Sequence, residues 1–452
     1  MRAARGGHLD DRGEAIMKLD ARSRSFPAPA LDGIPLLVPV VLTAGVLVAG
    51  LFDAIPENMI GGLAVIVGLG MLLGPLGNRL PVISKIGGGA LICLMVPSIL
   101  VYLGAFDENT LAAASALMKQ ANFLYFVICT LVVGSILGMS RKVMIGGLIR
   151  IFPPLLLGTV VAVSAGIAVA MAFGYSLHRA LFYIVVPIIG GGIGEGVIPL
   201  SSAYASALGG HQADFVAELI PAAIIGNIAA VITAGVLRRL GDRRPHLDGG
   251  GQLVKVPSAG PGPTGPAEPA PRDPAAPPRN HALGVLLICG MFVLATLLEH
   301  AVHLPAPVLV IIMSVLCKLF GVFPPVVEDS VRGVYTVISK YFIYPTMIGL
   351  GLLYLPLQSI IGVLSVGYVI ACVAVVLSMA GTGYVVGRAI GMYPVDASLV
   401  TVCHSGLGGT GDVAILSASN RMNLMPFAQI STRIGGVTTV ISAAALIKVW
   451  QG

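Results

Sequence analysis

The stretch Cys403-His-Ser-Gly-Leu-Gly-Gly-Thr-Gly-Asp-Val-Ala414 is a glycine-rich segment with a single acidic residue, set in a very apolar chain. A second stretch far upstream, Gly190-Gly-Gly-Ile-Gly-Glu-Gly196, repeats its pattern. Both contain Gly-x-Gly followed by an acidic residue, and both continue into apolar residues and a Leu-Ser pair. Two copies of one unusual segment, one in each half of the chain, predict a duplicated binding element.

The composition indicates the class of protein. The chain has 452 residues, of which 56% are hydrophobic and 11% are charged, and its mean hydropathy is +0.93. Soluble domains carry roughly a quarter charged residues, and many runs here approach the ~20 apolar residues that cross a bilayer. We therefore expect an all-α polytopic membrane protein. The net charge of +6 is interpreted as topology signal in short connections and tails, not as a nucleic-acid surface.

The hydropathy pattern predicts about eleven transmembrane helices. Residues 1–33 are predicted to form a polar, basic cytoplasmic tail without a signal-peptide pattern. The linker at 238–281 is rich in Pro and Gly, and we expect it to be flexible, cytoplasmic and without chemistry. The span count places the N-terminus in the cytoplasm and the C-terminus outside. The predicted spans are 34–52, 59–77, 86–104, 121–139, 153–173, 215–237, 282–299, 306–323, 335–355, 359–387 and 425–448.

Two further apolar segments, 181–208 and 395–418, are interrupted by glycine clusters, and the first also by Pro187 and Pro199. Broken backbone is tolerated at membrane depth only where it is buried in protein or lines a cavity. We predict two re-entrant hairpins, the first opening outside and the second inside. After the first span, the halves 34–237 and 282–452 then share one plan, which predicts an inverted-topology repeat of the kind found in secondary transporters.

Arg433 is the clearest outlier in the last span. It lies eight residues into that span, about 12 Å deep at ~1.5 Å per residue, where a charge costs at least ~2.5 kcal/mol on insertion scales. The planar guanidinium suits a carboxylate, so we predict a substrate-binding residue. The alternatives are snorkelling to the inner interface and a structural pair with Asp412.

The two glycine segments are the other candidate sites. Glycine backbone at a hairpin tip can aim N–H groups at an anion and carbonyls at a cation, although glycines also simply permit tight helix packing. Asp412 and Glu195 are candidates for binding a coupling cation or proton, or for capping a helix. The predicted substrate-binding residues are Gly192, Ile193, Gly194, Gly408, Gly409, Thr410 and Arg433.

Several polar residues have two interpretations each. Asn227 is a candidate site residue or an interhelical hydrogen bond, and His404 is a titrating group or a satisfied loop histidine. Arg421 is interpreted as a residue that marks the inner face of the membrane. The hydroxyls of Ser201 and Ser417 are possible ligands, although serines in membrane helices usually bond their own backbone. The six cysteines, which show no CxxC spacing, are interpreted as buried small hydrophobic residues.

With both segments and the last span in view, the chain resembles the 2-hydroxycarboxylate transporter family of bacterial Na⁺- or H⁺-coupled citrate and malate carriers. The resemblance is carried by the two glycine segments, by Leu416-Ser-Ala-Ser-Asn-Arg-Met-Asn-Leu424 and by Ala428-Gln-Ile-Ser-Thr-Arg-Ile-Gly-Gly436. It implies a homodimer in the bacterial inner membrane and an elevator-type cycle. It also implies that Arg433 binds a substrate carboxylate, and that the hairpin tips supply substrate and sodium ligands, with Cys403 and Gly406 among the coupling-cation candidates beside Glu195, Asp412 and Asn227.

The chain departs from the citrate carriers of that family at three positions. Those carriers have asparagine at the position of Ile193, arginine at that of Leu407 and a small residue at that of Glu195. The loss of a cation and an amide favours a dicarboxylate such as malate over a tricarboxylate, and the added carboxylate suggests proton coupling. No cofactor is expected other than Na⁺ or H⁺ as coupling ion.

Two other function classes are alternatives for such a chain. A membrane-embedded enzyme would use Asp412, Glu195 and His404, but the sequence shows no HExxH, no nucleophile elbow and no metal-ligand cluster. A passive anion channel is the other alternative. An inverted repeat has no evident purpose in an enzyme, so a symporter that carries malate or citrate into the cell is the leading hypothesis.

Overall fold

The computed structural model describes residues 30–31, 34–35, 37–81, 83–85, 88–255, 280–302, 306–358 and 364–450. Apart from the short ribbon of β1 (Ala30–Leu31) and β2 (Ile34–Pro35), the named elements of these residues are helices. The helices of the first half are α2 (Leu37–Leu51), α3 (Met59–Arg79), α4 (Gly88–Tyr102), α5 (Glu108–Ser115), α6 (Phe123–Gly138), α7 (Arg141–Arg150), α8 (Phe152–Ala172), α9 (Leu177–Arg179), α10 (Val186–Ile189), α11 (Ile198–Leu208) and α12 (Gln212–Arg243). Those of the second half are α13 (His281–Val302), α14 (Ala306–Phe320), α15 (Pro325–Val337), α16 (Ile343–Leu353), α18 (Val366–Ala389), α19 (Pro394–Cys403), α20 (Gly409–Ser419) and α21 (Met425–Trp450).

The protein is a multi-pass helical membrane protein, as the composition predicted. In the described part of the chain, seven helices are long and apolar enough to cross a membrane, or eight if one bent pair counts as a span. The predicted spans at 34–52, 86–104 and 306–323 coincide with helices of 15 residues. Such helices extend only about 22 Å, less than the ~30 Å hydrocarbon core, so the full count of eleven stays a prediction.

Several spans begin earlier than the sequence predicted, among them the fifth, which begins at Arg141 and not at 153, and two that contain a π-helical turn. The fourth was expected from 121, but the chain is already helical from Glu108 through a π-helical turn, η2 (Ala116–Gln120), and bends by 44° into α6. The side chain of Asp107 caps this helix by accepting from the N–H of Thr110. The ninth span was expected from 335 but begins at Pro325, and it also contains a π-helical turn, η6 (Ile338–Phe342).

Both broken segments fold back on themselves as helical hairpins. In the first hairpin (residues 177–208), the Tyr204 hydroxyl donates to the carbonyl oxygen of Phe182 at 3.1 Å. This hydrogen bond joins the two arms. In the second hairpin (residues 394–419), Asp396 at the start of the first arm lies 3.8 Å from the Arg421 side chain just beyond the second arm. Each chain reversal therefore occurs at its glycine segment.

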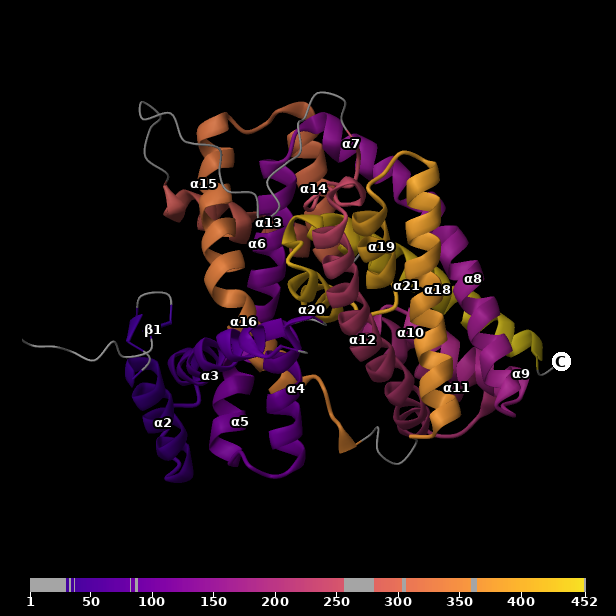
Figure 1. The fold of residues 1–452 in the computed structure, drawn as a ribbon, viewed down its shortest axis with the longest axis horizontal. Coiled ribbons are helices and arrows are strands. Elements are labelled where there is room, and N and C mark those ends of the chain that lie inside the picture. Colours follow the sequence, from indigo (N-terminus) through magenta and orange to yellow (C-terminus); the bar gives the residue numbers. More distant parts are fainter. Residues whose placement is uncertain are drawn as a thin grey trace, which may run out of the picture.

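The helices form two bundles that lie side by side in Figure 1. The first bundle contains α2–α6 and α13–α16, and the second contains α8, α12, α18, α21 and both hairpins. Each sequence half thus contributes to both bundles. The second hairpin packs into the boundary, where α20 contacts α12 on one side and α4 and α16 on the other.

The predicted linker at 238–281 is wrong for its first part. Helix α12 continues to Arg243, and residues 244–255, here called the strap, pack against the second hairpin. The N–H groups of Gly249 and Gly251 donate to Asp396 at 2.6 and 2.8 Å. Asp248 forms a buried ion pair with Arg421. The Pro-rich remainder at 256–279 lies outside the described residues.

Candidate functional site

The tips of the two hairpins touch each other through their backbones. A Cβ added to Gly192 would lie 2.4 Å from the carbonyl carbon of Leu407, and one added to Gly408 would lie 2.5 Å from the carbonyl oxygen of Gly191. Gly192 and Gly408 also have φ of +93° and +68°, which L side chains rarely adopt. Glycine is therefore required at both of these positions.

The hairpins reach this contact from opposite ends of α21. The base of the first packs near the C-terminus of that helix, where the rings of His178 and Trp450 are 6.0 Å apart. The second hairpin runs directly into the helix start through Arg421 and η7 (Met422–Leu424). Because α21 has 26 residues and is about 39 Å long, the tips meet near its middle.

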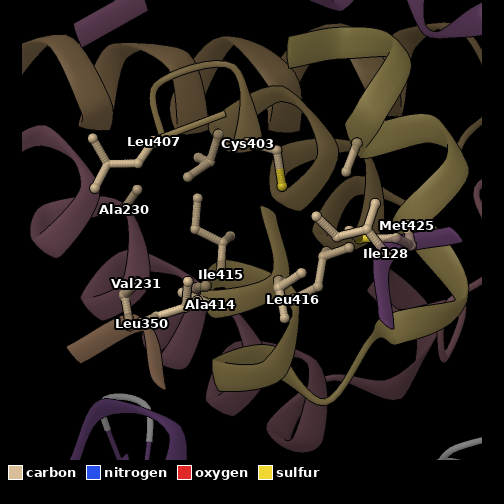
Figure 2. Packing of buried hydrophobic residues seen from close by; sticks show 14 of the residues in the cluster. Ile128, Ala230, Val231, Leu350, Cys403, Leu407, Ala414, Ile415, Leu416 and Met425 are labelled. Atoms are coloured by element: carbon tan, nitrogen blue, oxygen red, sulfur yellow. The ribbon is translucent and has the colours of Figure 1, made fainter. Parts of the chain in front are cut away.

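Asn227 of α12 holds the second tip from behind. Its side-chain oxygen accepts from the N–H of Leu407 at 3.1 Å, and the residue is 2% exposed. A Cβ on Gly411 would come within 2.7 Å of that oxygen. Figure 2 shows the apolar side chains of α6, α12 and α16 that gather around the same hairpin. Asn227 therefore fixes the second tip to α12 through a hydrogen bond, and its role as a coupling-ion residue stays a prediction.

Asp412 is fully buried and forms part of a polar chain with α21. Its two carboxylate oxygens accept from Gln429 and from the hydroxyl of Thr432, each at 2.8 Å. The Thr432 hydroxyl also lies 3.2 Å from the carbonyl oxygen of Cys403. These contacts gather a carboxylate, a hydroxyl and a carbonyl from three elements. Such oxygen ligands suit a hard cation.

Arg433 is joined to this chain through Gln429. The Arg433 Nε donates to the side-chain oxygen of Gln429 at 3.0 Å, while the amide nitrogen of Gln429 donates to Asp412. Residues 429 and 433 are one turn apart on the same helix face, which makes the contact possible. The arginine is 4% exposed, so the snorkelling alternative does not fit, and Gln429 couples it to Asp412.

A cavity of about 320 Å³ opens beside Arg433, between the two bundles. One wall consists of both hairpin tips and Arg433, and the opposite wall consists of α6 and Tyr354 beyond the end of α16. The cavity combines one guanidinium, the first turn of α20 and backbone of the tips with apolar and aromatic surface. That combination can orient a small anion. Its lining residues are Leu124, Tyr125, Ile128, Gly191, Ile193, Tyr354, Leu407, Gly408, Gly409, Thr410 and Arg433.

The predicted substrate residues divide into three groups. Ile193, Gly408, Gly409, Thr410 and Arg433 line the cavity. Gly192 lies at the contact between the tips. The surroundings of Gly194 and of the Glu195 side chain lie outside the described part of the structure, so what was predicted for these two residues stays a prediction. Their backbone belongs to the π-helical turn η4 (Ile193–Val197).

The other candidates lie behind the cavity. Cys403 is fully buried, and its carbonyl oxygen lies within hydrogen-bonding distance of the Thr432 hydroxyl. Gly406 packs near Ile415 and Asn227. His404 is completely buried against Gly435. The Ser201 hydroxyl donates to its own helix, at the carbonyl of Ile198.

Arg421, interpreted as a residue that marks the inner face of the membrane, lies buried beside the strap, and its role in topology stays a prediction. Its side chain is 4% exposed and pairs with Asp248. The sequence around Arg421 does not predict this ion pair, because the partner, Asp248, lies 173 residues away.

Sequence reasoning missed Gln429, Thr432, Tyr125 and Tyr354. The spacing of Gln429, Thr432 and Arg433 places them on one face of a helix, and this was the available signal. The tyrosines approach the cavity only through packing between elements far apart in the chain. Among the described residues, no group of three or more His, Cys, Asp or Glu side chains is arranged to hold a metal ion.

Comparison with known proteins now decides the family. Residues 31–445 match the 2-hydroxycarboxylate transporter family. This chain belongs to that family. It is 48% identical to a Na⁺-malate symporter of Bacillus subtilis (strain 168), with 92% of each chain covered. It is 34% identical to a citrate/malate-proton symporter of the same organism over 90% of each chain.

A more distant member of the 2-hydroxycarboxylate transporter family is a citrate/sodium symporter of Salmonella typhimurium. It is 31% identical, over 92% of this chain and 94% of the relative. These relatives are symporters and not enzymes, so the hypothesis of a membrane-embedded enzyme is set aside. Their coupling ions are Na⁺ or H⁺, as the sequence predicted.

Proposed function

We propose that the protein is a secondary active symporter that carries malate, with Na⁺ as the coupling ion. The observation that carries this proposal is the cavity at the hairpin tips, in which Arg433 is the sole cationic side chain among the described lining residues. The relatives that are Na⁺-malate, citrate/malate-proton and citrate/sodium symporters support a 2-hydroxycarboxylate as substrate.

One guanidinium beside backbone N–H groups suits a dicarboxylate better than a tricarboxylate. Arg433 would bind one carboxylate through its planar fork, and the first turn of α20 at Gly409 and Thr410 would bind the other. Leu407 stands in the lining where the resemblance places an arginine in citrate carriers. We therefore expect malate to be transported better than citrate.

The coupling cation would bind behind the substrate, at the oxygen atoms around Asp412. The carboxylate of Asp412, the hydroxyl of Thr432 and the carbonyl of Cys403 already approach one another. Gln429 links this cluster to Arg433. A cation there would offset the buried charge of Asp412 and tighten the same chain that orients Arg433, which gives a physical route for coupling.

We further propose that the two hairpins are re-entrant, that the two halves form an inverted repeat, and that transport follows an elevator-type cycle. In support, the hairpins approach from opposite ends of α21, and each half contributes one hairpin to the second bundle. The second bundle, which would carry the substrate at the hairpin tips, would slide along the first. Such a movement would expose the cavity alternately to each side.

The orientation follows from the distribution of basic residues. The end that contains the strap, α7 and the C-terminal turn of α12 is basic, so the positive-inside rule supports a cytoplasmic location for it. The C-terminus beside Trp450 would then face outside. Basic residues at the strap end are Arg141, Lys142, Arg150, Arg238, Arg239, Arg243, Arg244, Lys318, Arg332 and Arg388.

The homodimer implied by the family resemblance stays a prediction for this chain. Crosslinking in native membranes would test it.

The deciding experiment is uptake of radiolabelled malate into proteoliposomes with the Na⁺ gradient and the pH gradient imposed independently. We expect accumulation driven by inward Na⁺, with weaker uptake of citrate. Accumulation driven only by a proton gradient would support the symporter proposal but would identify H⁺, and not Na⁺, as the coupling ion. Passive equilibration without accumulation would indicate a channel and would refute the proposal.

A further inference from the structure

A second cavity, of about 360 Å³, lies at the strap end of the same boundary between the bundles. The first bundle contributes Ser135, Arg332, Tyr335 and Thr336, and the strap and α21 lie on the other side. Its volume falls in the roughly 300–1,000 Å³ range of small-molecule pockets. It is displaced along the bundles from the first cavity. Ile128 and Gly134 of α6 line the two cavities, and six residues separate these positions by about 9 Å.

Arg332 supplies the charge of this second cavity. Two carboxylates, Glu328 and Asp329, lie about one turn earlier on α15; Glu328 pairs with Lys318 at 2.8 Å, and no ion pair joins Asp329 to Arg332 in the described part of the chain. Within the described ranges, Arg332 itself forms no ion pair. Its carbon stem lies beside Gly138, where an added Cβ would be 3.9 Å from Arg332 Cδ. The guanidinium is thus available to a ligand in the cavity.

The remaining polar groups of the lining leave donors available. Asn423 accepts from the Tyr335 hydroxyl through its oxygen, so its amide nitrogen can still donate. Ser140 accepts from the N–H of Val143 and keeps its own hydroxyl hydrogen. Carboxylate oxygens only accept hydrogen bonds when ionised. A guanidinium, an amide N–H and a hydroxyl in one cavity therefore match a small carboxylate anion.

We propose that this cavity is a second anion-binding site, weaker than the first, where a small dicarboxylate binds on the cytoplasmic side of the same path. The identity of the anion rests on the proposed function, whereas the existence of the site rests on Arg332 and its neighbours. The hydrogen bond from Tyr335 to Asn423 joins α15 to the segment before α21. A sliding second bundle must break that bond, and an anion at Arg332 would offer the Tyr335 hydroxyl a replacement acceptor.

The test is equilibrium binding of radiolabelled malate to the purified full-length protein in detergent. We expect two components for the wild type, one of them at least about tenfold weaker. Arg332→Gln should remove the weaker component and keep the tighter one, and Arg332→Lys should retain part of it. Arg433→Gln should do the reverse. Arg388→Gln is the matched control, because Arg388 is an exposed arginine at the strap end of α18 and lines neither cavity.

The outcomes separate the two proposals. A single component that is lost in Arg433→Gln and unchanged in Arg332→Gln would overturn the second site and leave the proposed function intact. Loss of the weaker component in Arg388→Gln as well would also overturn it, because the effect would then reflect general surface charge. Two components in a protein that shows no gradient-driven uptake would support the site and refute the symporter. Thermal melting of each variant distinguishes lost binding from lost folding.

Discussion

The two hairpins have matching tips and different anchors. The first hairpin is held at its base by aromatic packing, with the ring of Phe182 5.9 Å from both Tyr204 and Trp450 and nearly perpendicular to each. The second is held by charge, through Asp396, Arg421 and Asp248 of the strap. The glycine-rich pattern of the tips is therefore shared by the two hairpins, whereas the side chains that anchor their bases differ.

In the described part of the chain, the polar side chains of the site come mainly from the second hairpin and α21. Among the described residues, Asp412, Gln429, Thr432 and Arg433 form one connected set. The first hairpin adds backbone and Ile193 to the cavity. Under the proposed function, the side chains for selectivity and coupling would therefore come mainly from the second hairpin and α21, while both hairpins supply backbone to the cavity.

Breaking the charged anchor should have the largest effect. Asp248→Ala leaves Arg421 buried without its strap partner, and loss of one member of a buried ion pair costs about 3–5 kcal/mol. We expect the free energy of unfolding in detergent to fall by about 3 kcal/mol, because Asp396 remains 3.8 Å from Arg421. Chemical unfolding monitored by the single tryptophan, Trp450, measures it.

The matched control for that variant is Glu328→Gln. It breaks the pair with Lys318, whose side chains are 12% and 23% exposed. A partly solvated pair is worth about 1 kcal/mol or less. Equal destabilisation by both variants would show that the strap does not anchor the second hairpin.

Removing the charge of the cavity should have the next largest effect. Arg433→Gln exchanges charge-assisted hydrogen bonds for neutral ones, a loss of about 2–3 kcal/mol. That corresponds to about a 30- to 150-fold fall in kcat/KM for malate uptake. Initial uptake rates in proteoliposomes, normalised to inserted protein, measure it. Unchanged uptake would show that the substrate does not bind in this cavity.

Arg388→Gln serves as control for that measurement, because it removes an exposed arginine of α18 and leaves the cavity untouched. We expect uptake within about twofold of wild type, since surface substitutions change free energies by only about ±0.5 kcal/mol.

Asp412→Asn separates coupling from substrate binding. The amide keeps one of the two acceptor oxygens, for Gln429 or for Thr432, and it removes the charge that would hold the cation. We expect the half-saturating Na⁺ concentration to rise about tenfold, or about 1.4 kcal/mol. The KM for malate at saturating Na⁺ should change much less. An unaltered Na⁺ dependence together with a raised malate KM would assign Asp412 to the substrate side.

The sequence predicted those parts of the molecule that have a local signature. Glycine and proline in apolar stretches located both hairpins, and a charge deep in an apolar helix located Arg433. What it missed depends on distant residues that meet only after folding. In the sequence, Arg421 and Asp248 resemble ordinary surface charges. The role of Gln429 becomes evident only from its hydrogen bond to Asp412 in the folded protein.

The early start of the fourth span was missed for a different reason. The helix before η2 is less apolar than a typical span, and its start depends on the Asp107 cap. A hydropathy pattern does not detect an end that is fixed by one hydrogen-bonding side chain.

The smallest expected effect is at the aromatic anchor of the first hairpin. Tyr204→Phe keeps the ring and its packing with Phe182 but removes the hydroxyl that donates across the hairpin. A buried neutral hydrogen bond contributes about 1 kcal/mol. The free energy of unfolding should therefore fall by about that amount, with uptake nearly unchanged. Tyr102→Phe, at a half-exposed tyrosine, should have no measurable effect on either. If Tyr204→Phe instead destabilised the protein as strongly as Asp248→Ala, the first hairpin would depend on hydrogen bonding as much as the second. The contrast between a packed anchor and a charged anchor would then be wrong.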